Sequence, residues 1–212
     1  MNEYLRNVKL TALALLGFAV VAAVLLAGTF GLTRPSIEKS ERDAKIKLIA
    51  QVLPAGGYDN DLVKTARSLP ADPLLGLKKP GEYYPATLAG KPAAVVLEAI
   101  APDGYAGEIK LLVGILPDGR LTGVRVTAHS ETPGLGDYID IAKNPWIRQF
   151  AGKSLDSPKP DDWRVKKDGG KFDSMAGATI SPRAVVKAVK QALDYFARHQ
   201  TELLVQEEIH GQ

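Results

Sequence analysis

Residues 107–128, GEIKLLVGILPDGRLTGVRVTA, contain the pattern that decides the fold class. Two apolar runs, 107–116 and 120–128, lie on either side of Pro117-Asp118-Gly119. Proline presets φ, aspartate bonds to nearby backbone amides and glycine accepts a positive φ, so this tripeptide is typical of a tight turn. The second run mixes apolar residues with polar neighbours, as expected of a partly exposed antiparallel strand. The stretch therefore predicts a β-hairpin.

Other short elements surround the hairpin. The run AAVVLEAI at 93–100 predicts a buried strand, whereas residues 54–92 are rich in proline and glycine and predict loops with short elements. After the hairpin, residues 145–150 predict a short helix, and residues 163–165 are a further strand candidate.

The C-terminal part of the chain contains the clearest helix. Ser181 is a good N-cap, and Pro182 suits the first helical position. Apolar residues then recur on one helical face: Val185, Val189, Ala192, Leu193 and Phe196. Strands in the middle of the chain and helices at its ends predict an α+β fold with antiparallel strands and flanking helices.

Composition limits the chemistry that the chain can perform. It contains no cysteine, which excludes disulfides, thiolate zinc sites, cysteine-ligated iron–sulfur clusters and c-type haem attachment. The three histidines, His129, His199 and His210, are far apart and suggest no metal site. The formal net charge is +3 and the lysines are spread along the chain, so no nucleic-acid-binding tract is present. Any redox chemistry must therefore come from an organic cofactor.

Residues 10–30, LTALALLGFAVVAAVLLAGTF, predict a transmembrane helix. They carry no charge, and as a helix they span about 30 Å, the thickness of the hydrocarbon core of a bilayer. The alternatives are a cleaved signal peptide, whose apolar region is shorter, and a buried helix of a soluble protein, which has a polar face. Arg6 and Lys9 precede the segment and Arg34 is among several basic residues after it, so charge alone leaves the orientation open.

An amphipathic helix is predicted directly after this segment. The sequence SIEKSERDAKIKLIAQVL at 36–53 has an apolar stripe, and Ser36 can cap its start. Pro54 and the glycines that follow end it.

Residues 172–185, FDSMAGATISPRAV, lead through small residues into the predicted C-terminal helix. Small residues let a bulky group approach the backbone, and the first amides of a helix favour an anion such as a phosphate. Thr179 supplies a hydroxyl two residues before the expected cap. A plain loop capped by Ser181 accounts for the same residues, so the local pattern alone leaves both interpretations open.

This segment resembles the flavinylation motif of the FMN-binding domain in the G subunit of Rnf electron-transport complexes and in the C subunit of sodium-pumping quinone reductases. The motif has Asp, two variable residues, a small residue and Gly-Ala-Thr. It is matched by Asp173, Ala176, Gly177, Ala178 and Thr179, although Ser or Thr is common in place of Ala176. The resemblance implies that a flavin transferase takes FMN from FAD and joins its phosphate to Thr179 by a phosphoester. It also implies that Gly177, Ala178 and Ser181 lie at the cofactor and that Asp173 assists the transferase.

A second segment, SETPGLG at 130–136, also resembles the Rnf protein. A flavin needs an apolar plane against its ring and hydrogen-bonding groups at its edge. The resemblance implies that Leu135 contacts the ring and that Glu131 and Thr132 supply polar contacts. The structural alternative is a Pro-Gly turn that ends a strand.

Five further residues are expected to have ordinary structural roles. Trp146 and Trp163 can stack on a flavin, but packing in a core or an interface is the expectation. Lys143 and Arg183 can hold a phosphate and His129 can contact a flavin, but solvated side chains are the default interpretation.

Over nearly the whole chain, the resemblance predicts the G subunit of an Rnf-type complex, in which electron flow between ferredoxin and NAD is coupled to ion movement. The expected organisation is a cytoplasmic tail, a transmembrane helix, a juxtamembrane helix and loop region, an FMN-binding domain and a second tail, at 1–9, 10–30, 31–92, 93–205 and 206–212. The expected location is the inner membrane, with the domain on the periplasmic side.

The predicted partners are the other membrane subunits of the complex and the flavin transferase. No metal site and no nucleic-acid partner are expected. Two alternatives stay open: the C subunit of a sodium-pumping NADH:quinone reductase, and a non-redox binding module tethered to the membrane.

Overall fold

The computed structural model describes residues 2–205, and for residues 2–6, 9, 11, 38 and 41 it describes the backbone alone. The predicted tail at 206–212 therefore lies outside the described residues. The chain divides into two compact units, Met1–Lys45 and Ile46–Gln212, and each is described by itself.

The first unit consists of most of helix α1, Asn2–Ala50. The prediction of a separate helix capped by Ser36 is wrong, because α1 runs without interruption through Pro35. A proline inside a helix removes one amide and crowds the carbonyl one turn back, which either kinks the helix or ends it. Pro35 is therefore an internal residue of α1 rather than a boundary between two helices.

The apolar part of α1 is a candidate membrane span. Among the described residues it is the one helix that is long and apolar enough to cross a bilayer. Its large apolar side chains from Val8 to Leu32 are 48–85% exposed. Such a long exposed apolar surface is stable only against lipid or other apolar groups. The structure thus places a candidate span where the sequence predicted one.

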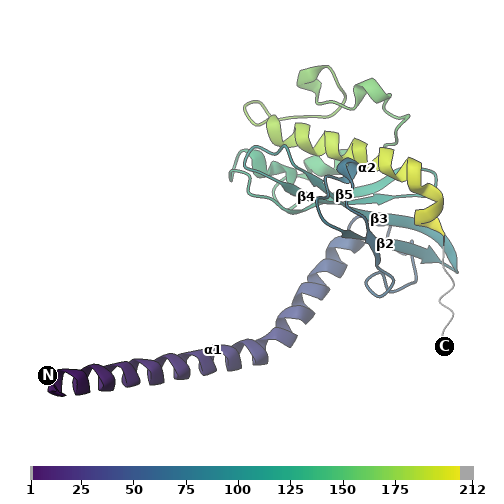
Figure 1. Ribbon diagram of the computed structural model, residues 1–212. Coiled ribbons are helices and arrows are strands. Elements are labelled where there is room, and N and C mark those ends of the chain that lie inside the picture. The colour runs from purple at the N-terminus through teal and green to yellow at the C-terminus, as the bar shows by residue number, and fades with distance from the viewer. Residues whose placement is uncertain (1, 206–212) are drawn as a thin grey trace. The chain divides into compact units, whose positions relative to one another are not determined.

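The second unit is built on a five-stranded antiparallel sheet (Figure 1). The strands follow one another in chain order: β1 Arg67–Leu69, β2 Gly81–Leu88, β3 Lys91–Ala101, β4 Ile109–Ile115 and β5 Leu121–Ala128. The predicted hairpin is confirmed as β4 and β5. Its turn is closed by the amide of Gly119, which donates to the carbonyl of Leu116 at 2.9 Å. With the helices on either side, the α+β prediction is confirmed.

Strand β2 lies in a region where mainly loops were expected. Its sequence contains Pro85, which usually argues against a strand because proline cannot donate a ladder bond. The amide and carbonyl of one strand residue point to the same side. The carbonyl of Pro85 accepts from Asn60 Nδ2 at 2.9 Å, and β1 pairs with residues 81–83 only. Pro85 therefore faces the side of β2 that β1 leaves open, where no ladder bond is lost.

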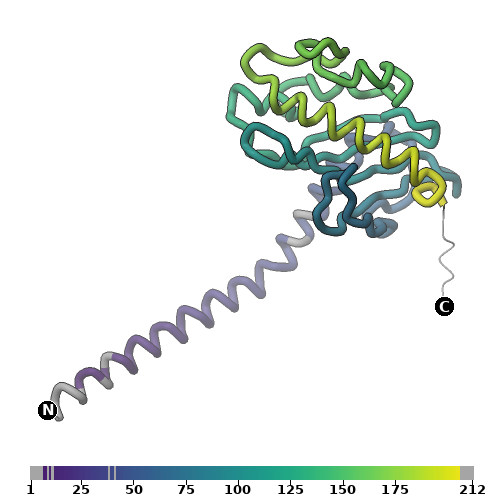
Figure 2. Tube along the Cα trace, turned by 45° about the horizontal axis from the view of Figure 1, so that its top comes forward, coloured from purple at the N-terminus to yellow at the C-terminus, as the bar shows by residue number. Residues whose placement is uncertain are grey.

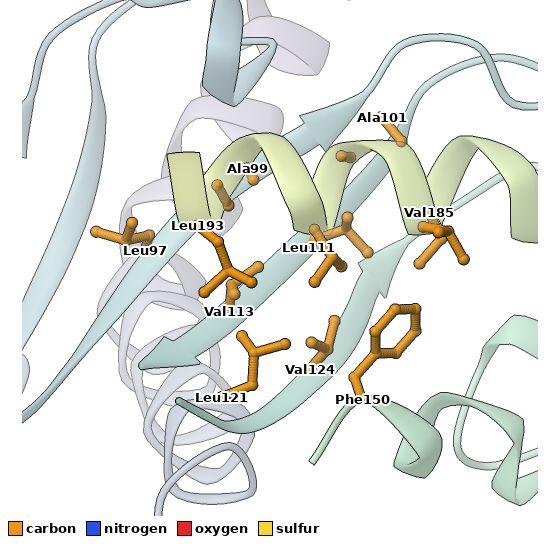
Figure 3. Packing of buried hydrophobic residues seen from close by; sticks show 14 of the residues in the cluster. Leu97, Ala99, Ala101, Leu111, Val113, Leu121, Val124, Phe150, Val185 and Leu193 are labelled. Carbon is orange, nitrogen blue, oxygen red and sulfur yellow. The ribbon is translucent and has the colours of Figure 1, made fainter. Parts of the chain in front are cut away.

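Both faces of the sheet are buried. Helix α2, Ile180–Leu204, covers one face, and the predicted apolar stripe of α2 is fully buried. Figure 3 shows Val185 and Leu193 of α2 among side chains from β3, β4 and β5. A smaller core on the other face contains Ile49 and Val52, from the end of α1 and just after it, packed with alternate residues of β3. Burial on both faces explains why residues 93–100 form an unbroken apolar run.

An irregular segment, residues 129–178, connects β5 to α2 and is drawn in green in Figure 2. The short helix predicted at 145–150 is confirmed as a 3-10 helix. The strand predicted at 163–165 is wrong: Val165 makes one isolated bridge to Phe172. Trp146 and Trp163 are buried in an aromatic cluster with Phe150 and Phe172, as expected of core residues.

Two paired glycines let Val52 approach the sheet. Gly114 and Gly123 face each other on β4 and β5. A Cβ on Gly114 would overlap the carbonyl oxygen of Val52 and the hydroxyl of Thr122, which itself donates to that carbonyl. A Cβ on Gly123 would lie 3.3 Å from Val52 Cα, a milder crowding. The backbone of residue 52 thus lies directly on the sheet.

We predict that Gly114→Ala lowers the free energy of unfolding of the second unit by about 1–3 kcal/mol, the usual cost of overpacking. Gly123→Ala is the matched control, with a smaller loss. The measurement is guanidinium unfolding in detergent, followed by the fluorescence of Trp146 and Trp163, which are the chain's two tryptophans. Equal losses for the two variants would contradict the close contact at Gly114.

Candidate functional site

Helix α2 begins at Ile180, with Thr179 in the N-cap position. The prediction that Ser181 caps the helix is wrong, because its hydroxyl donates to Glu131 Oε2 at 2.6 Å instead. Pro182 lies within the first turn, where an amide has no partner in the helix and its loss costs little. The hydroxyl of Ser181 is therefore used for a tertiary contact across 50 residues of sequence.

The carboxylate of Glu131 connects three segments around the site. The side chain is 4% exposed, and besides Ser181 it accepts a hydrogen bond from the amide of Ala106 at 3.2 Å. A Cβ added to Gly104 or to Gly136 would lie 2.7 Å from this carboxylate. A buried carboxylate is tolerated when donors satisfy it. Glu131 therefore joins the loop before β4, its own loop after β5, and the start of α2.

A cavity of about 330 Å³ opens between these segments. It is lined by all seven residues that the sequence resemblance assigned to cofactor binding: Glu131, Thr132, Leu135, Gly177, Ala178, Thr179 and Ser181. Tyr105, Gly136 and Ile180 complete the lining. Two motifs that are separate in sequence thus meet at one cavity. The contact of these residues with a cofactor stays a prediction.

The cavity has an apolar mouth and a polar interior. Tyr105, Leu135 and Ile180 line it and are 68%, 55% and 45% exposed. Glu131 and Ser181 line it as buried polar groups. Ligand sites of this size combine apolar walls with a few placed polar groups.

A turn precedes Thr179 and places its hydroxyl. Gly177 has φ of +82°, a conformation that favours glycine. The hydroxyl of Thr179 donates to the carbonyl of Met175 at 3.4 Å, and the residue is 7% exposed. The first amides of α2, those of Ile180 and Ser181, have no partner one turn back in the helix. They can donate hydrogen bonds to an anion beside this hydroxyl.

Tyr138, which no sequence motif indicates, holds this turn. Its hydroxyl donates to the carbonyl of Ala178 and accepts from the amide of Met175, both at 3.0 Å. Burial raises the pKa of the Tyr138 hydroxyl above its ordinary value, and the Met175 amide opposes this rise less strongly. The hydroxyl therefore keeps its proton at neutral pH. Its position just after the loop at 130–136 is the only sequence signal that points to it.

Asp173 and Arg183 are engaged in ion pairs at the edge of the site. Asp173 Oδ1 lies 2.5 Å from Lys166 Nζ, whereas the hydroxyl of Thr179 bonds to Met175. Arg183 makes two hydrogen bonds to Asp168, which hold the pKa of that carboxyl below its usual value. Neither residue lines the cavity.

His129 and Lys143 also lie outside the lining of the cavity. Nδ1 of His129 accepts from the amide of Glu131 at 3.1 Å, and Lys143 is exposed. Lys143 is thus an exposed side chain, whereas half-buried His129 supports the loop that carries Glu131.

Family models match both parts of the chain. The model of the FMN-binding domain matches residues 104–194, which contain the whole cavity. The model of the RnfG N-terminal region matches residues 1–52, which contain α1.

Curated relatives match the chain over nearly its full length. A Pseudomonas aeruginosa (strain UCBPP-PA14) protein, named as the G subunit of an ion-translocating oxidoreductase complex, is 48% identical over 210 residues, covering 99% of this chain and 96% of the relative. Proteins of the same name from Vibrio cholerae serotype O1 (strain ATCC 39541) and Aliivibrio fischeri (strain MJ11) are 46% and 44% identical, each covering 94% of this chain and 95% of the relative.

Among solved structures, the C subunit of the Na(+)-translocating NADH-quinone reductase from Parabacteroides distasonis is similar with a TM-score of 0.44 and 20% identity. The match covers 70% of each chain.

We predict that Ser181→Ala lowers the free energy of unfolding by about 1.5–3 kcal/mol, the range for a hydrogen bond to a charged group. The carboxylate of Glu131 stays buried but loses its hydroxyl donor. Ser130→Ala, at an exposed position of the same loop, is the control, and its effect should stay within about 0.5 kcal/mol. Indistinguishable unfolding midpoints for the two variants would show that the Ser181–Glu131 contact does not stabilise the site.

Proposed function

The chain belongs to the family of G subunits of ion-translocating oxidoreductase complexes, and from this premise we propose that it carries electrons through FMN bonded covalently to Thr179. The single observation that carries the proposal is the cavity at Thr179. It joins the hydroxyl expected to hold the flavin with the loop expected to contact the ring.

The residues around Thr179 fit a phosphate joined to its oxygen. Gly177 and Ala178 are small, and nothing lies within 4 Å of a Cβ built on Gly177, so a bulky group can approach the turn. The first amides of α2 and the positive end of its dipole favour the anion. No arginine is needed, which agrees with the pairing of Arg183 to Asp168.

The rest of the cavity fits the flavin ring. When bound, FMN supplies the capacity to accept and release electrons, and the protein supplies its position and surroundings. Leu135, Tyr105 and Ile180 offer apolar surface to the ring. Thr132 and the Glu131–Ser181 pair offer polar groups to its edge.

Attachment is a group transfer from FAD by a flavin transferase. The oxygen of Thr179 forms a bond to the phosphorus of the FMN half, and the pyrophosphate bond of FAD breaks. AMP leaves with the bridging oxygen, and the hydroxyl proton passes to a base. No oxidant or reductant is consumed.

The anchor and the domain fit a component of a membrane complex. We propose that α1 spans the inner membrane with its start in the cytoplasm, and that the second unit lies on the periplasmic side. Its partners are the other membrane subunits of the complex. The support for this proposal is the uncharged, exposed apolar surface of α1 together with the family membership.

The two alternatives fit less well. The C subunit of a sodium-pumping quinone reductase shares the FMN-binding domain, but the near full-length relatives from Pseudomonas, Vibrio and Aliivibrio bear the name of the G subunit. A non-redox binding module would leave Thr179 unmodified, and the visible absorption spectrum of the purified protein distinguishes it.

We predict that Thr179→Ala abolishes covalent flavin without unfolding the domain, because it removes the hydroxyl and keeps a small residue before the helix. Thr179→Ser keeps a hydroxyl and retains part of the labelling. The measurement is in-gel fluorescence of denatured protein made together with its transferase, with mass spectrometry of the peptide that spans residues 173–183. A fluorescent Thr179→Ala band, or an FMN mass on Ser174 or Ser181 of the unaltered protein, rejects Thr179 as the attachment site.

We predict a single span with the second unit outside the cytoplasm. Protease added to intact spheroplasts should digest that unit and leave a membrane-bound fragment containing residues 10–30. A cytoplasmic protein in the same spheroplasts serves as the control for leakage. Protection of the domain until the cells are lysed would place it on the cytoplasmic side.

A further inference from the structure

Thr179 lines the cavity, but its hydroxyl is poorly accessible for the reaction that would modify it. Attack on phosphorus needs free space beyond the attacking oxygen, because the leaving group departs on the far side in line with it. The attacking group, Thr179, is 7% exposed, and its hydroxyl points at the carbonyl of Met175. A transferase with its bound FAD must approach this oxygen from outside.

The residues that lead into Thr179 form a largely exposed segment. We call residues 173–178 the attachment segment. Three of its side chains, those of Asp173, Met175 and Ala176, are exposed, so lifting it uncovers little apolar surface. Opening such segments costs far less than unfolding the domain.

The start of the attachment segment is well fixed. The amide of Asp173 donates to Gln149 Oε1 at 2.8 Å, and its carbonyl accepts from Trp146 Nε1 at 2.6 Å. These bonds leave Asp173 in place when the rest of the segment moves.

The remainder of the segment depends on Tyr138. Among the described residues, the side-chain hydrogen bonds to the backbone of residues 174–178 come from Thr179 itself and from Tyr138, which bonds to both Met175 and Ala178. The Tyr138 hydroxyl thus bonds to the backbone at both ends of the turn, at Met175 and at Ala178. Gly177, at φ of +82°, gives the turn a residue that reaches other conformations without a Cβ clash.

We propose that the flavin transferase acts on an opened form of the attachment segment, in which the Tyr138 hydroxyl has released Met175 and Ala178 and the Thr179 oxygen faces solvent. This inference rests on the proposed attachment of FMN to Thr179. In the opened form the Thr179 oxygen bonds to the phosphorus of FAD, AMP leaves and the proton passes to a base of the transferase. The segment then closes again over the linkage.

Tyr138→Phe tests this directly. It removes one oxygen and with it two bonds to the segment, but keeps the ring, which packs edge-on against Trp146 with centroids 5.7 Å apart. If labelling depends on the opened form, the variant should be labelled at least about fivefold faster, as expected from the loss of two hydrogen bonds. Tyr195→Phe, which removes a hydroxyl from a buried tyrosine of α2, is the matched control and should leave the rate unchanged.

The experiment uses full-length protein made without transferase and purified in detergent. Transferase, Mg²⁺ and FAD are added at enzyme concentrations where the rate is proportional to enzyme, and covalent fluorescence is followed in time. Hydrogen exchange of the peptide at 173–179 is measured on the same flavin-free samples. The Ala178 amide in this peptide reports opening without the transferase, because it donates to the Met175 carbonyl at 3.2 Å and Tyr138→Phe keeps that acceptor.

Labelling and exchange together show whether the transferase acts on the opened or the closed form. Faster labelling together with faster exchange in Tyr138→Phe supports the proposal. Unchanged or slower labelling despite faster exchange overturns it, because the transferase then acts on the closed form. If Tyr138→Phe does not fold, Gly177→Ala strains the closed turn at φ of +82°, where a Cβ meets nothing within 4 Å, and is judged by the same comparison. Failure to label the unaltered protein instead rejects attachment to the chain itself.

Discussion

The burial of the Glu131 carboxylate is the constraint on which the rest of the site depends. A buried polar group is tolerated only when it is hydrogen-bonded, and here the donors come from the loop before β4 and from the first turn of α2. Satisfying one carboxylate therefore fixes where α2 begins relative to the end of β5. The cavity is the space left between the segments that meet at this group, and Thr179 stands at its wall because Ser181, two residues later, is held by Glu131.

The sheet makes this meeting possible, and much of it follows from sequence patterns. The turn chemistry at 117–119 predicts the hairpin, and the 3.6-residue period of α2 predicts the stripe that covers the sheet. At Ser181 and Pro85, contacts with residues distant in sequence override a local preference. Ser181 is a good cap by type, but its hydroxyl serves Glu131, and Pro85 is accepted in β2 because β1 is too short to pair with it.

The part of the site that belongs to short sequence motifs was predicted. Seven expected residues line one cavity, although their spacing in sequence contains no information on their distance in space. Tyr105, Ile180 and Tyr138 were not predicted, because an exposed aromatic, an aliphatic residue and a tyrosine in a loop have no distinctive pattern. Their roles arise only when the loop before β4, the turn after β5 and the start of α2 come together.

The aromatic cluster beside the attachment segment has an optical consequence. Both tryptophans of the chain are buried in this cluster, and Trp146 is hydrogen-bonded to the first residue of the segment that leads to Thr179. Tryptophan emission overlaps the near-ultraviolet absorption of a flavin, so a flavin held at Thr179 as proposed would accept excitation energy from these indoles. With FMN at that position, the protein would contain its own donor–acceptor pair. Quenching of its intrinsic emission measures the fraction of molecules that carry the cofactor, without any added label.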